Sequence, residues 1–440
     1  MAPARPPAPP LDPVAEAPLS SAQERLWFIH QAAPESPVYN VPLLTRFNEP
    51  IDPAALAVAL EAVTACHAVL RTTYALREGR PVQVIGAPGP VPMEVIGRGR
   101  PGPDELAHHA RAPFALDRRA PLRATVWQDP DGGPGTLLLT IHHIAVDGWS
   151  LPALYDALDA AYEQALCGVR PIDLPAPPLA YAEFAARDAE AAKDPALRTR
   201  LAARAAELAP AAEDLTLGPC PPRQDALEGE RPGAQHRLVL DAPLAEAVAE
   251  LARELRVTPF VVLFAAFQAV VQRWSGRERF VLGTVAANRP AAEVENLVGF
   301  FVNTVPLLCA PDPEAGFDRL CVGSRGEAFR VLDHQRLPFD RLAARLGGDR
   351  GAGLADIGFV LQNAPAAGAR GRWAPPVLLP TGTAKQDLSF VLEYAPDGTL
   401  AATVEYATDR YTDVTAQRFA DSYLALLTAA VARPTTPLKE

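Results

Sequence analysis

The stretch Ile141-His142-His143-Ile144-Ala145-Val146-Asp147-Gly148-Trp149-Ser150 is the most informative part of this 440-residue chain. Just before it, the residues Thr136–Thr140 form a short apolar run, which is typical of a buried strand. Just after it, apolar residues from Leu151 to Leu166 recur at helical spacing and predict a helix. The two histidines are therefore expected where a strand ends and the chain turns into a helix, with a rigid element on each side.

Each residue type in this turn has a plausible chemical role. Histidine titrates near neutral pH and can take or relay a proton. A buried Asp147 would need a cationic or hydrogen-bonding partner, while Gly148 lets the backbone approach a substrate or adopt a positive φ. The simpler alternative is two ordinary histidines followed by an Asp-Gly turn. A second pair, His108–His109, has no Asp-Gly after it and is expected on a solvated helix face.

Composition narrows the functional class. The formal net charge of −11 and the lack of a basic stripe argue against nucleic-acid binding, because nothing would neutralise phosphates. The five cysteines form no Cys-x-x-Cys pair, so neither a disulfide framework nor a zinc site is indicated, and no metal is expected. No apolar run reaches membrane-spanning length. A cytoplasmic protein without a membrane partner is expected.

The central motif, His-His-x-x-x-Asp-Gly followed by Trp-Ser, resembles the active-site motif of condensation domains from nonribosomal peptide synthetases. These domains belong to a superfamily of acyltransferases related to chloramphenicol acetyltransferase. Other stretches resemble the family's remaining motifs in the same order, and they are Ser20–Phe28, His67–Tyr74, Tyr181–Phe184, Asn296–Thr304, His334–Asp340 and Phe359–Pro365. In the first of these stretches, Ser21 and Glu24 have the spacing of a helix capping box.

The chain also departs from the family pattern. Arg187 stands where a tryptophan is usual, and Leu308 where an arginine is usual. The segment 351–355 replaces the Ser-Arg-x-Pro-Leu motif, whose residues can line the acceptor channel. Contacts to the acceptor therefore cannot be transferred at this segment, and the substitution suggests a specialised acceptor.

The resemblance implies an α/β fold with two chloramphenicol acetyltransferase-like sandwich lobes, arranged as a V-shaped pseudo-dimer with a tunnel between them. The expected divisions are a disordered leader (1–17), an N-terminal lobe with the histidine motif (18–180), a connecting helix and linker (181–234), and a C-terminal lobe (235–434). A crossover loop near 364–387 is expected to run from the second lobe onto the first.

The resemblance also implies site roles. His143 is the catalytic residue, which either takes a proton from the acceptor or positions it, and His142 braces the turn. The amide of Gly148 and the following helix N-terminus are expected to stabilise the oxyanion. Asp147 is expected to be structural, in a salt bridge with Arg289 that joins the two lobes. The residues expected to line the substrate tunnel are Trp149, Ser150, Asn303, Gln362 and Asn363.

The expected activity is condensation, in which a peptidyl carrier protein donates an acyl or aminoacyl thioester to an amine or alcohol acceptor. The acceptor is a small molecule or is itself carrier-bound. The chain is expected to bind no cofactor itself, since the 4′-phosphopantetheine belongs to the carrier. No carrier-type Gly-Gly-x-Ser site is present, so a free-standing enzyme is expected. Two alternatives stay open, an acyl-CoA-dependent acyltransferase of the same superfamily and a non-catalytic recruitment module of the same fold.

Overall fold

The computed structural model describes residues 13–218, 221, 231–348, 351, 353–364 and 371–439. The described chain forms two compact units, and the predicted mixed α/β class is confirmed. The first unit holds the described residues up to Lys193, together with those of Arg289–Phe301 and Ala364–Thr381. The second unit holds the rest, so two segments from the C-terminal half of the chain belong to the first unit.

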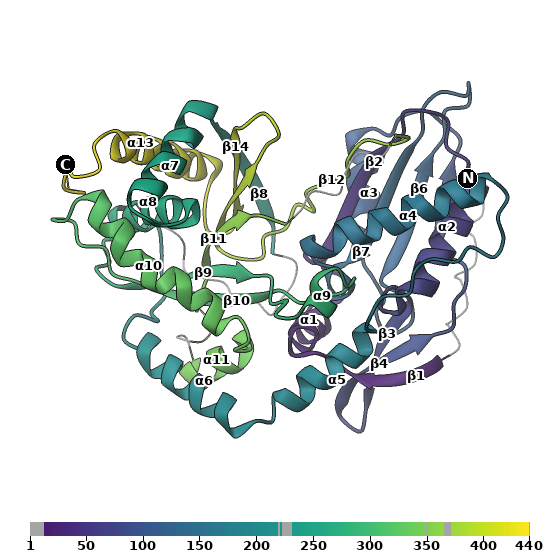
Figure 1. The fold of residues 1–440 in the computed structure, drawn as a ribbon, viewed down its shortest axis with the longest axis horizontal. Coiled ribbons are helices and arrows are strands. Elements are labelled where there is room, and N and C mark those ends of the chain that lie inside the picture. The colour runs from purple at the N-terminus through teal and green to yellow at the C-terminus, as the bar shows by residue number, and fades with distance from the viewer. Residues whose placement is uncertain are drawn as a thin grey trace. The chain divides into compact units, whose positions relative to one another are not determined.

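The first unit is built on two sheets, and its central strand carries the histidine motif at its end (Figure 1). In order, the five-stranded sheet consists of β12 (Val377–Leu378), β2 (Asn40–Arg46), β7 (Thr136–His142), β6 (Leu122–Trp127) and β5 (Met93–Ile96). The three-stranded sheet consists of β1 (Pro13–Pro18), β4 (Arg80–Gly86) and β3 (Thr72–Arg77). The helical elements of this unit are α1 (Ser21–Ala32), α2 (Pro53–Cys66), η1 (Ala68–Arg71), α3 (Pro103–Arg111), η2 (His143–Ala145), η3 (Gly148–Ser150), α4 (Leu151–Leu166), α5 (Tyr181–Ala191) and α9 (Ala292–Glu295).

Strand β7 is buried along its whole length, as its continuous apolar run predicts. It pairs antiparallel with β2 on one side and β6 on the other, and its last residue, His142, lies opposite Asn40. Helix α4 packs on this sheet, since the hydroxyl of Tyr155 lies 2.9 Å from Thr45 Oγ1 on β2 (Figure 1). The strand end that carries the two histidines is therefore held by neighbours on both sides and by a helix.

The N-terminus differs from the expectation. Residues 13–17 were predicted to belong to a disordered leader, but Pro13–Pro18 forms β1, which pairs antiparallel with β4. Side chains support the pairing, because Gln83 Nε2 donates to the carbonyl of Pro18 at 2.7 Å and Arg77 forms an ion pair with Glu16. The prediction was wrong for these residues because strand pairing uses backbone groups, which a Pro- and Ala-rich sequence does not reveal. Residues 1–12 lie outside the described part.

The division between units falls within the predicted connecting segment, 181–234. Its first helix, α5, belongs to the first unit, and the next helix, α6 (Pro195–Leu208), to the second. Residues 219–220 and 222–230 of that segment lie outside the described chain. Of the predicted crossover loop, Ala364 and 371–381 belong to the first unit, where β12 pairs with β2, and 365–370 lie outside the described chain.

The second unit has one six-stranded mixed sheet, whose order is β10 (Asn303–Cys309), β9 (Phe280–Ala286), β11 (Ile357–Gln362), β13 (Leu388–Tyr394), β14 (Leu400–Ala407) and β8 (Gly233–Leu240). Besides α6, its helices are α7 (Ala242–Glu254), α8 (Pro259–Ser275), α10 (Phe317–His334), α11 (Phe339–Leu346) and α13 (Asp413–Ala432). Helix α8 is central in this unit, since every residue from Val261 to Val271 is buried.

No described helix is by itself long and apolar enough to cross a bilayer. Only α7 and α8 taken together reach that length and composition, and they are bent by 105° relative to each other. The buried residues of α8 belong to the core of the second unit, which accounts for the apolar composition of this pair.

Candidate active site

The histidine motif occupies the turn between β7 and α4, as the sequence predicts. His142 is the last residue of β7, η2 begins at His143, and η3 leads from Gly148 into α4. Asp147 caps η3, because its side chain accepts a hydrogen bond from Ser150 N and the Ser150 hydroxyl accepts one from Asp147 N. The expected turn is thus a pair of short 3-10 segments held by a reciprocal cap.

The imidazole of His143 is oriented by its own turn. Its Nδ1 lies 2.6 Å from the carbonyl oxygen of Val146, and its backbone N–H donates to the Tyr39 carbonyl at 2.7 Å. Because a carbonyl can only accept, Nδ1 carries the proton, and in the neutral ring Nε2 carries the lone pair. The side chain is half buried, and its ring lies in edge-to-face geometry with Tyr39 and Phe300. The turn therefore presents one basic nitrogen in a defined tautomer.

His142 has a different environment. It is only 3% exposed, and its Nδ1 accepts a hydrogen bond from the backbone N–H of Ile144 at 3.1 Å. Burial holds the pKa of His142 well below its usual value, and the nearby His30, His143 and Arg123 act in the same direction. A buried neutral ring that accepts a bond from its own turn braces that turn, which agrees with the role expected of it.

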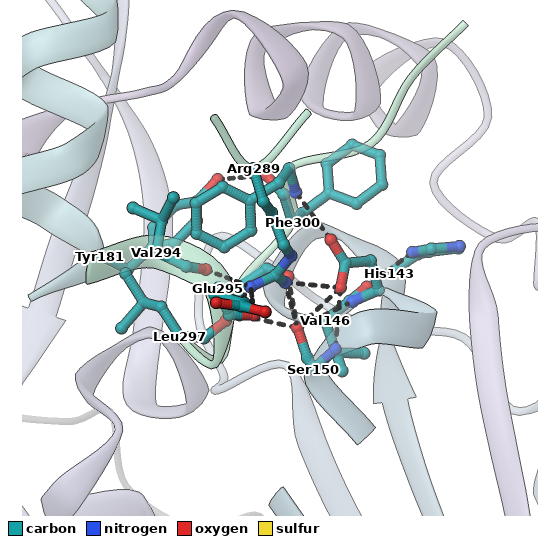
Figure 2. A network of polar contacts seen from close by, with 12 residues as sticks. His143, Val146, Ser150, Tyr181, Arg289, Val294, Glu295, Leu297 and Phe300 are labelled. Atoms are coloured by element: carbon teal, nitrogen blue, oxygen red, sulfur yellow. Dashed lines mark hydrogen bonds and ion pairs between the residues drawn. The ribbon is translucent and has the colours of Figure 1, made fainter. Parts of the chain in front are cut away.

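Asp147 and Arg289 form the predicted ion pair, and both side chains are buried. Figure 2 shows Arg289 and Ser150 within this network of polar contacts. Arg289 Nη2 lies 2.7 Å from Asp147 Oδ1, which also accepts from Ser150 N at 2.9 Å. The other oxygen, Oδ2, accepts from Phe301 N at 3.1 Å. A buried carboxylate with this many donors is fully engaged and has no lone pair directed at a substrate.

The charge of Arg289 offsets only part of the effect of burial, so the pKa of Asp147 remains above its usual value. Burial raises the pKa of the Asp147 carboxyl, while Arg289, Ser150 and the Phe301 amide lower it. Since every one of these contacts donates to the carboxylate, the geometry favours the ionised form. These contacts support the structural role predicted for Asp147, which stays a prediction.

The location of this pair differs from the expectation. The sequence placed Arg289 in a second lobe, with the salt bridge joining the lobes, but Arg289–Phe301 and the histidine motif belong to the same unit. The physical reason is the number of contacts that this segment makes with the motif. Ser150 Oγ accepts from Gly299 N at 3.1 Å and lies 2.8 Å from Gly299 O. Arg289 also folds the segment onto itself, because its Nη1 contacts the carbonyl oxygens of Val294, Glu295 and Leu297 at 2.6, 3.1 and 2.8 Å.

Ser150, Trp149 and Gly148 have different environments. Ser150 is fully buried, and its hydroxyl contacts Asp147, Arg289 and Gly299, so it belongs to the ion-pair network and was wrongly predicted to line a substrate tunnel. Trp149 and Gly148 are half buried. Gly148 does not have a positive φ. A glycine at this position therefore matters because it has no side chain that would keep a substrate from the backbone.

Three other predicted tunnel residues lie in the second unit. Asn303 is half buried and its amide is used by the protein, so its predicted place in the tunnel lining stays a prediction. The amide donates to the carbonyls of Gln335 and Leu337 at 2.9 and 2.6 Å and accepts from Phe339 N at 3.3 Å. Gln362 ends β11 and is half buried, and Asn363 follows it and is exposed. Substrate contacts of these two residues stay a prediction.

Sequence reasoning missed the residues that support the motif from a distance along the chain. Gln23 is fully buried, and its Nε2 contacts the Ile144 carbonyl at 3.3 Å and Tyr74 Oη at 3.2 Å. The hydroxyl of Tyr181, also buried, donates to the Phe300 carbonyl. Both residues lie within stretches already noted as motifs, but nothing in a linear sequence indicates which turn such a side chain reaches.

One acidic group among the described residues could in principle hold a cation. Oxygens of Asp214, Asp356 and Asp387 lie within 4.8 Å of one another in the second unit. The buried Asp387 already forms ion pairs with Arg410 and Arg231, so its charge is compensated by two guanidinium groups. The group is therefore an ion-pair network and carries no argument for a metal.

Comparison with known proteins covers nearly the whole chain. A family model described as "Condensation domain" matches residues 14–440. The chain is 33% identical, over 94% of its length, to the phosphinothricin tripeptide synthetase PhsC from Streptomyces viridochromogenes, and it spans 39% of that protein. It is 32% identical, over 95% of its length, to the chondramide synthase cmdD from Chondromyces crocatus, and it spans 11% of that protein. Other curated relatives are longer still, the chain covering as little as 3 to 6% of their length.

Solved structures match over the same extent. SgcC5 from Streptomyces globisporus, crystallised with (R)-(-)-1-(2-naphthyl)-1,2-ethanediol and sucrose, is 25% identical with a TM-score of 0.75, covering 96% of this chain and all of that one. The X-domain from teicoplanin biosynthesis, solved in complex with OxyB, has a TM-score of 0.84 at 21% identity, covering 100% of this chain and 98% of that one. At 21% identity, the match to the X-domain shows a shared fold and nothing more.

Proposed function

The chain belongs to the condensation-domain family, and on this basis we propose that it joins a carrier-bound acyl or aminoacyl thioester to an amine or alcohol acceptor at His143. The observation that carries the proposal is the 2.6 Å contact between His143 Nδ1 and the Val146 carbonyl. It leaves the basic lone pair on Nε2, the atom that a general base or an acceptor-positioning group needs.

The proposed step is a nucleophilic substitution at the thioester. The acceptor nitrogen or oxygen attacks the carbonyl carbon, and its N–H or O–H proton passes to His143 Nε2 or is held there by a hydrogen bond. The carbonyl re-forms as the C–S bond breaks, and the carrier's phosphopantetheine thiolate leaves and takes up a proton. Holding both reactants at one imidazole would supply part of the rate through orientation.

The other motif residues support this step. The Val146 carbonyl stabilises an imidazolium at His143, since it accepts from the nitrogen that stays protonated throughout. Burial and the neutral state of His142 keep a second positive charge away from the site. We assign oxyanion stabilisation to the Gly148 amide, as the family resemblance implies.

Amide and ester formation are both part of the proposal. SgcC5 was crystallised with an aromatic 1,2-diol, and that observation concerns SgcC5. It nevertheless supports the inclusion of alcohols among the acceptors to be tested. The altered segment at 351–355, which departs from the family pattern, further supports a specialised acceptor.

The carrier is proposed as a separate partner protein, and the 4′-phosphopantetheine arm belongs to it. The curated relatives are long synthetases, of which this chain corresponds to one part, so the free-standing state stays a prediction. A cytoplasmic location also stays a prediction.

Two alternatives remain to be tested beside the main proposal. The superfamily resemblance is compatible with a soluble acyl-CoA donor. A recruitment module of the same fold is the other alternative, and the fold shared with the X-domain, whose structure was solved with OxyB, is compatible with it. The oriented imidazole of His143 favours catalysis over recruitment.

The experiment is a condensation assay with a carrier-loaded aminoacyl thioester and a mixture of amine and alcohol acceptors, with products identified by mass spectrometry. A parallel reaction supplies the same acyl group as its CoA thioester. His143→Ala should lower the rate at least about 100-fold, the usual contribution of a general base. His108→Ala, at an exposed histidine of α3, is the matched control and should leave the rate unchanged.

Product from the carrier donor alone would support the proposal, and its mass would distinguish amide from ester. Product from acyl-CoA alone would replace the proposal with the CoA-dependent alternative. If no donor gives product in the wild type while the chain still captures a synthetase partner, recruitment becomes the better explanation.

A further inference from the structure

We propose that Phe300 is a positioning residue, through which the buried Asp147–Arg289 network holds the imidazole of His143 in its reactive orientation. This inference rests on the proposed function of His143. Phe300 occupies the variable position of the stretch that resembles Gly-x-Phe-Val-Asn-Thr, so the motif itself does not single it out.

The first step is the ring contact. The centroid of Phe300 lies 5.0 Å from that of His143, with an interplanar angle of 72°. Phe300 is only 7% exposed, and edge-to-face pairs at this spacing are favourable beyond the area they bury. The Val146 carbonyl fixes one nitrogen of the imidazole, and the Phe300 ring restricts its rotation from a second direction.

The second step is the backbone on either side of Phe300, which is fixed by buried groups (Figure 2). Before it, Gly299 N donates to Ser150 Oγ at 3.1 Å, and after it, Phe301 N donates to Asp147 Oδ2 at 3.1 Å. Asp147 and Ser150 are in turn bound by Arg289 Nη2, at 2.7 and 3.0 Å. The place of the Phe300 ring is therefore set by the ion-pair network.

The third step is Tyr181, which holds the carbonyl of Phe300 itself. The Tyr181 hydroxyl donates to that carbonyl and lies 3.0 Å from Ser20 Oγ. Burial raises the pKa of Tyr181 well above its usual value, so the hydroxyl keeps its proton and remains a donor. The ring of Tyr181 also packs on Gly299, where an added Cβ would lie 2.0 Å from Tyr181 Cδ2. Tyr181 thus acts as a clamp on the same backbone.

Through these contacts, the buried ion pair influences the orientation of the His143 imidazole. Ser150 and Asp147, both bound by Arg289, anchor the backbone before and after Phe300. The Phe300 ring lies against His143. Since a displacement of about 1 Å at a reacting group can cost about 100-fold in rate, a loosened Phe300 should lower kcat more than it changes binding.

The test compares Phe300→Leu, Tyr181→Phe and their combination with the wild type. Tyr181→Phe removes one hydroxyl and keeps the ring over Gly299, so it should fold even if Phe300→Leu does not. Tyr155→Phe is the matched control, because it also removes a buried tyrosine hydroxyl from the first unit, one that contacts Thr45 instead of Phe300. The three measurements are kcat and KM in the condensation assay, Tm, and the NMR signal of the His143 ring in protein with ¹³C-labelled histidine, assigned with His143→Ala.

Phe300→Leu is expected to lower kcat about tenfold with KM nearly unchanged. Tyr181→Phe should lower kcat in the wild-type background and have no further effect in the Phe300→Leu background, since coupled residues are non-additive. Both variants should shift or broaden the His143 ring signal, and Tyr155→Phe should leave it unchanged.

Additive effects on kcat, an unchanged His143 signal in both variants, or an equal change in Tyr155→Phe would overturn the inference. The NMR measurement needs no turnover, so it separates this inference from the proposed function. If the wild type makes no product, a selective change of the His143 signal still supports the positioning role, and its absence still refutes it.

Discussion

Replacing Arg289 with methionine removes the cation of the buried ion pair with Asp147. The guanidinium contacts Asp147, Ser150 and three backbone carbonyls, and its carbon Cζ lies 4.1 Å from the centroid of the Phe301 ring. Methionine keeps much of the aliphatic volume but none of the donors. Asp147 would remain buried, 2% exposed, without its counter-charge.

The expected cost follows from these contacts. Removing one partner of a buried ion pair costs about 3 to 5 kcal/mol, because the other charge stays desolvated. For a unit of roughly 200 residues, each kcal/mol lowers Tm by about 2 to 4 °C, so a fall of at least about 6 °C is expected. The control is Arg187→Met, which removes exposed ion pairs to Glu183 and Glu293, the latter in the same 289–301 segment. Exposed pairs contribute little, so the control should melt close to the wild type.

The pH dependence gives a second, independent readout. Arg289 lowers the pKa of Asp147 against the effect of burial, so its loss should raise that pKa further above the usual value of 3.8. When a carboxyl has a higher pKa in the folded state than in the unfolded state, the folded state loses stability as pH rises from the lower pKa to the higher one. The deficit of Arg289→Met relative to wild type should therefore grow as pH rises above 3.8 and shrink as pH falls back towards it. Melting curves for both variants over this range check it, and a deficit no larger than that of Arg187→Met, or one independent of pH, would refute the reasoning.

Three further outcomes are expected. His143→Ala should lower the condensation rate at least about 100-fold while leaving Tm within error of wild type, since its half-buried ring serves chemistry more than packing, and a lowered Tm would contradict this. Gly299→Ala should lower both Tm and kcat, because its Cβ would lie 2.0 Å from a carbon of the Tyr181 ring; unchanged thermal melting and kinetics would show that the ring can move aside. Burial lowers the pKa of His67 to about 4, so its neutral form contributes stability that is complete above its usual value of 6.5 and is lost as pH falls towards 4. His67→Gln should therefore make Tm less sensitive to pH in that acidic range, and an unaltered Tm–pH curve would argue against this role.

The local structure of the candidate site was largely predictable from the sequence. Apolar periodicity placed the end of a strand at His142 and the start of a helix after Ser150, and the structure has β7 and α4 there. Another local feature is the N-cap of α7, where Asp241 accepts a hydrogen bond from Leu244 N at 3.0 Å. Such features depend on residues close together in the sequence, whose propensities act before any tertiary contact forms.

Small errors arose where tertiary contacts choose between similar local options. The capping box of α1 was assigned to Ser21 and Glu24, but the structure forms it with Ser20 and Gln23. Both pairs have the required spacing, so the sequence alone does not distinguish them. The choice is made by Gln23, whose buried amide also reaches Tyr74 and Ile144 and therefore fixes where the helix begins.

By itself, the sequence determined the mixed α/β class, the position of the histidine turn and, through family resemblance, the pairing of Asp147 with Arg289. The tertiary structure alone decided that the 289–301 segment belongs to the unit of the histidine motif, that Ser150 and Asn303 are used internally, and that Phe300 meets His143. The reason is that a buried polar group must find a partner wherever the fold provides one. Local propensity can show that Asp147 and Ser150 need partners, but only the folded chain brings Gly299, Phe301 and Arg289 to them across about 140 to 150 residues.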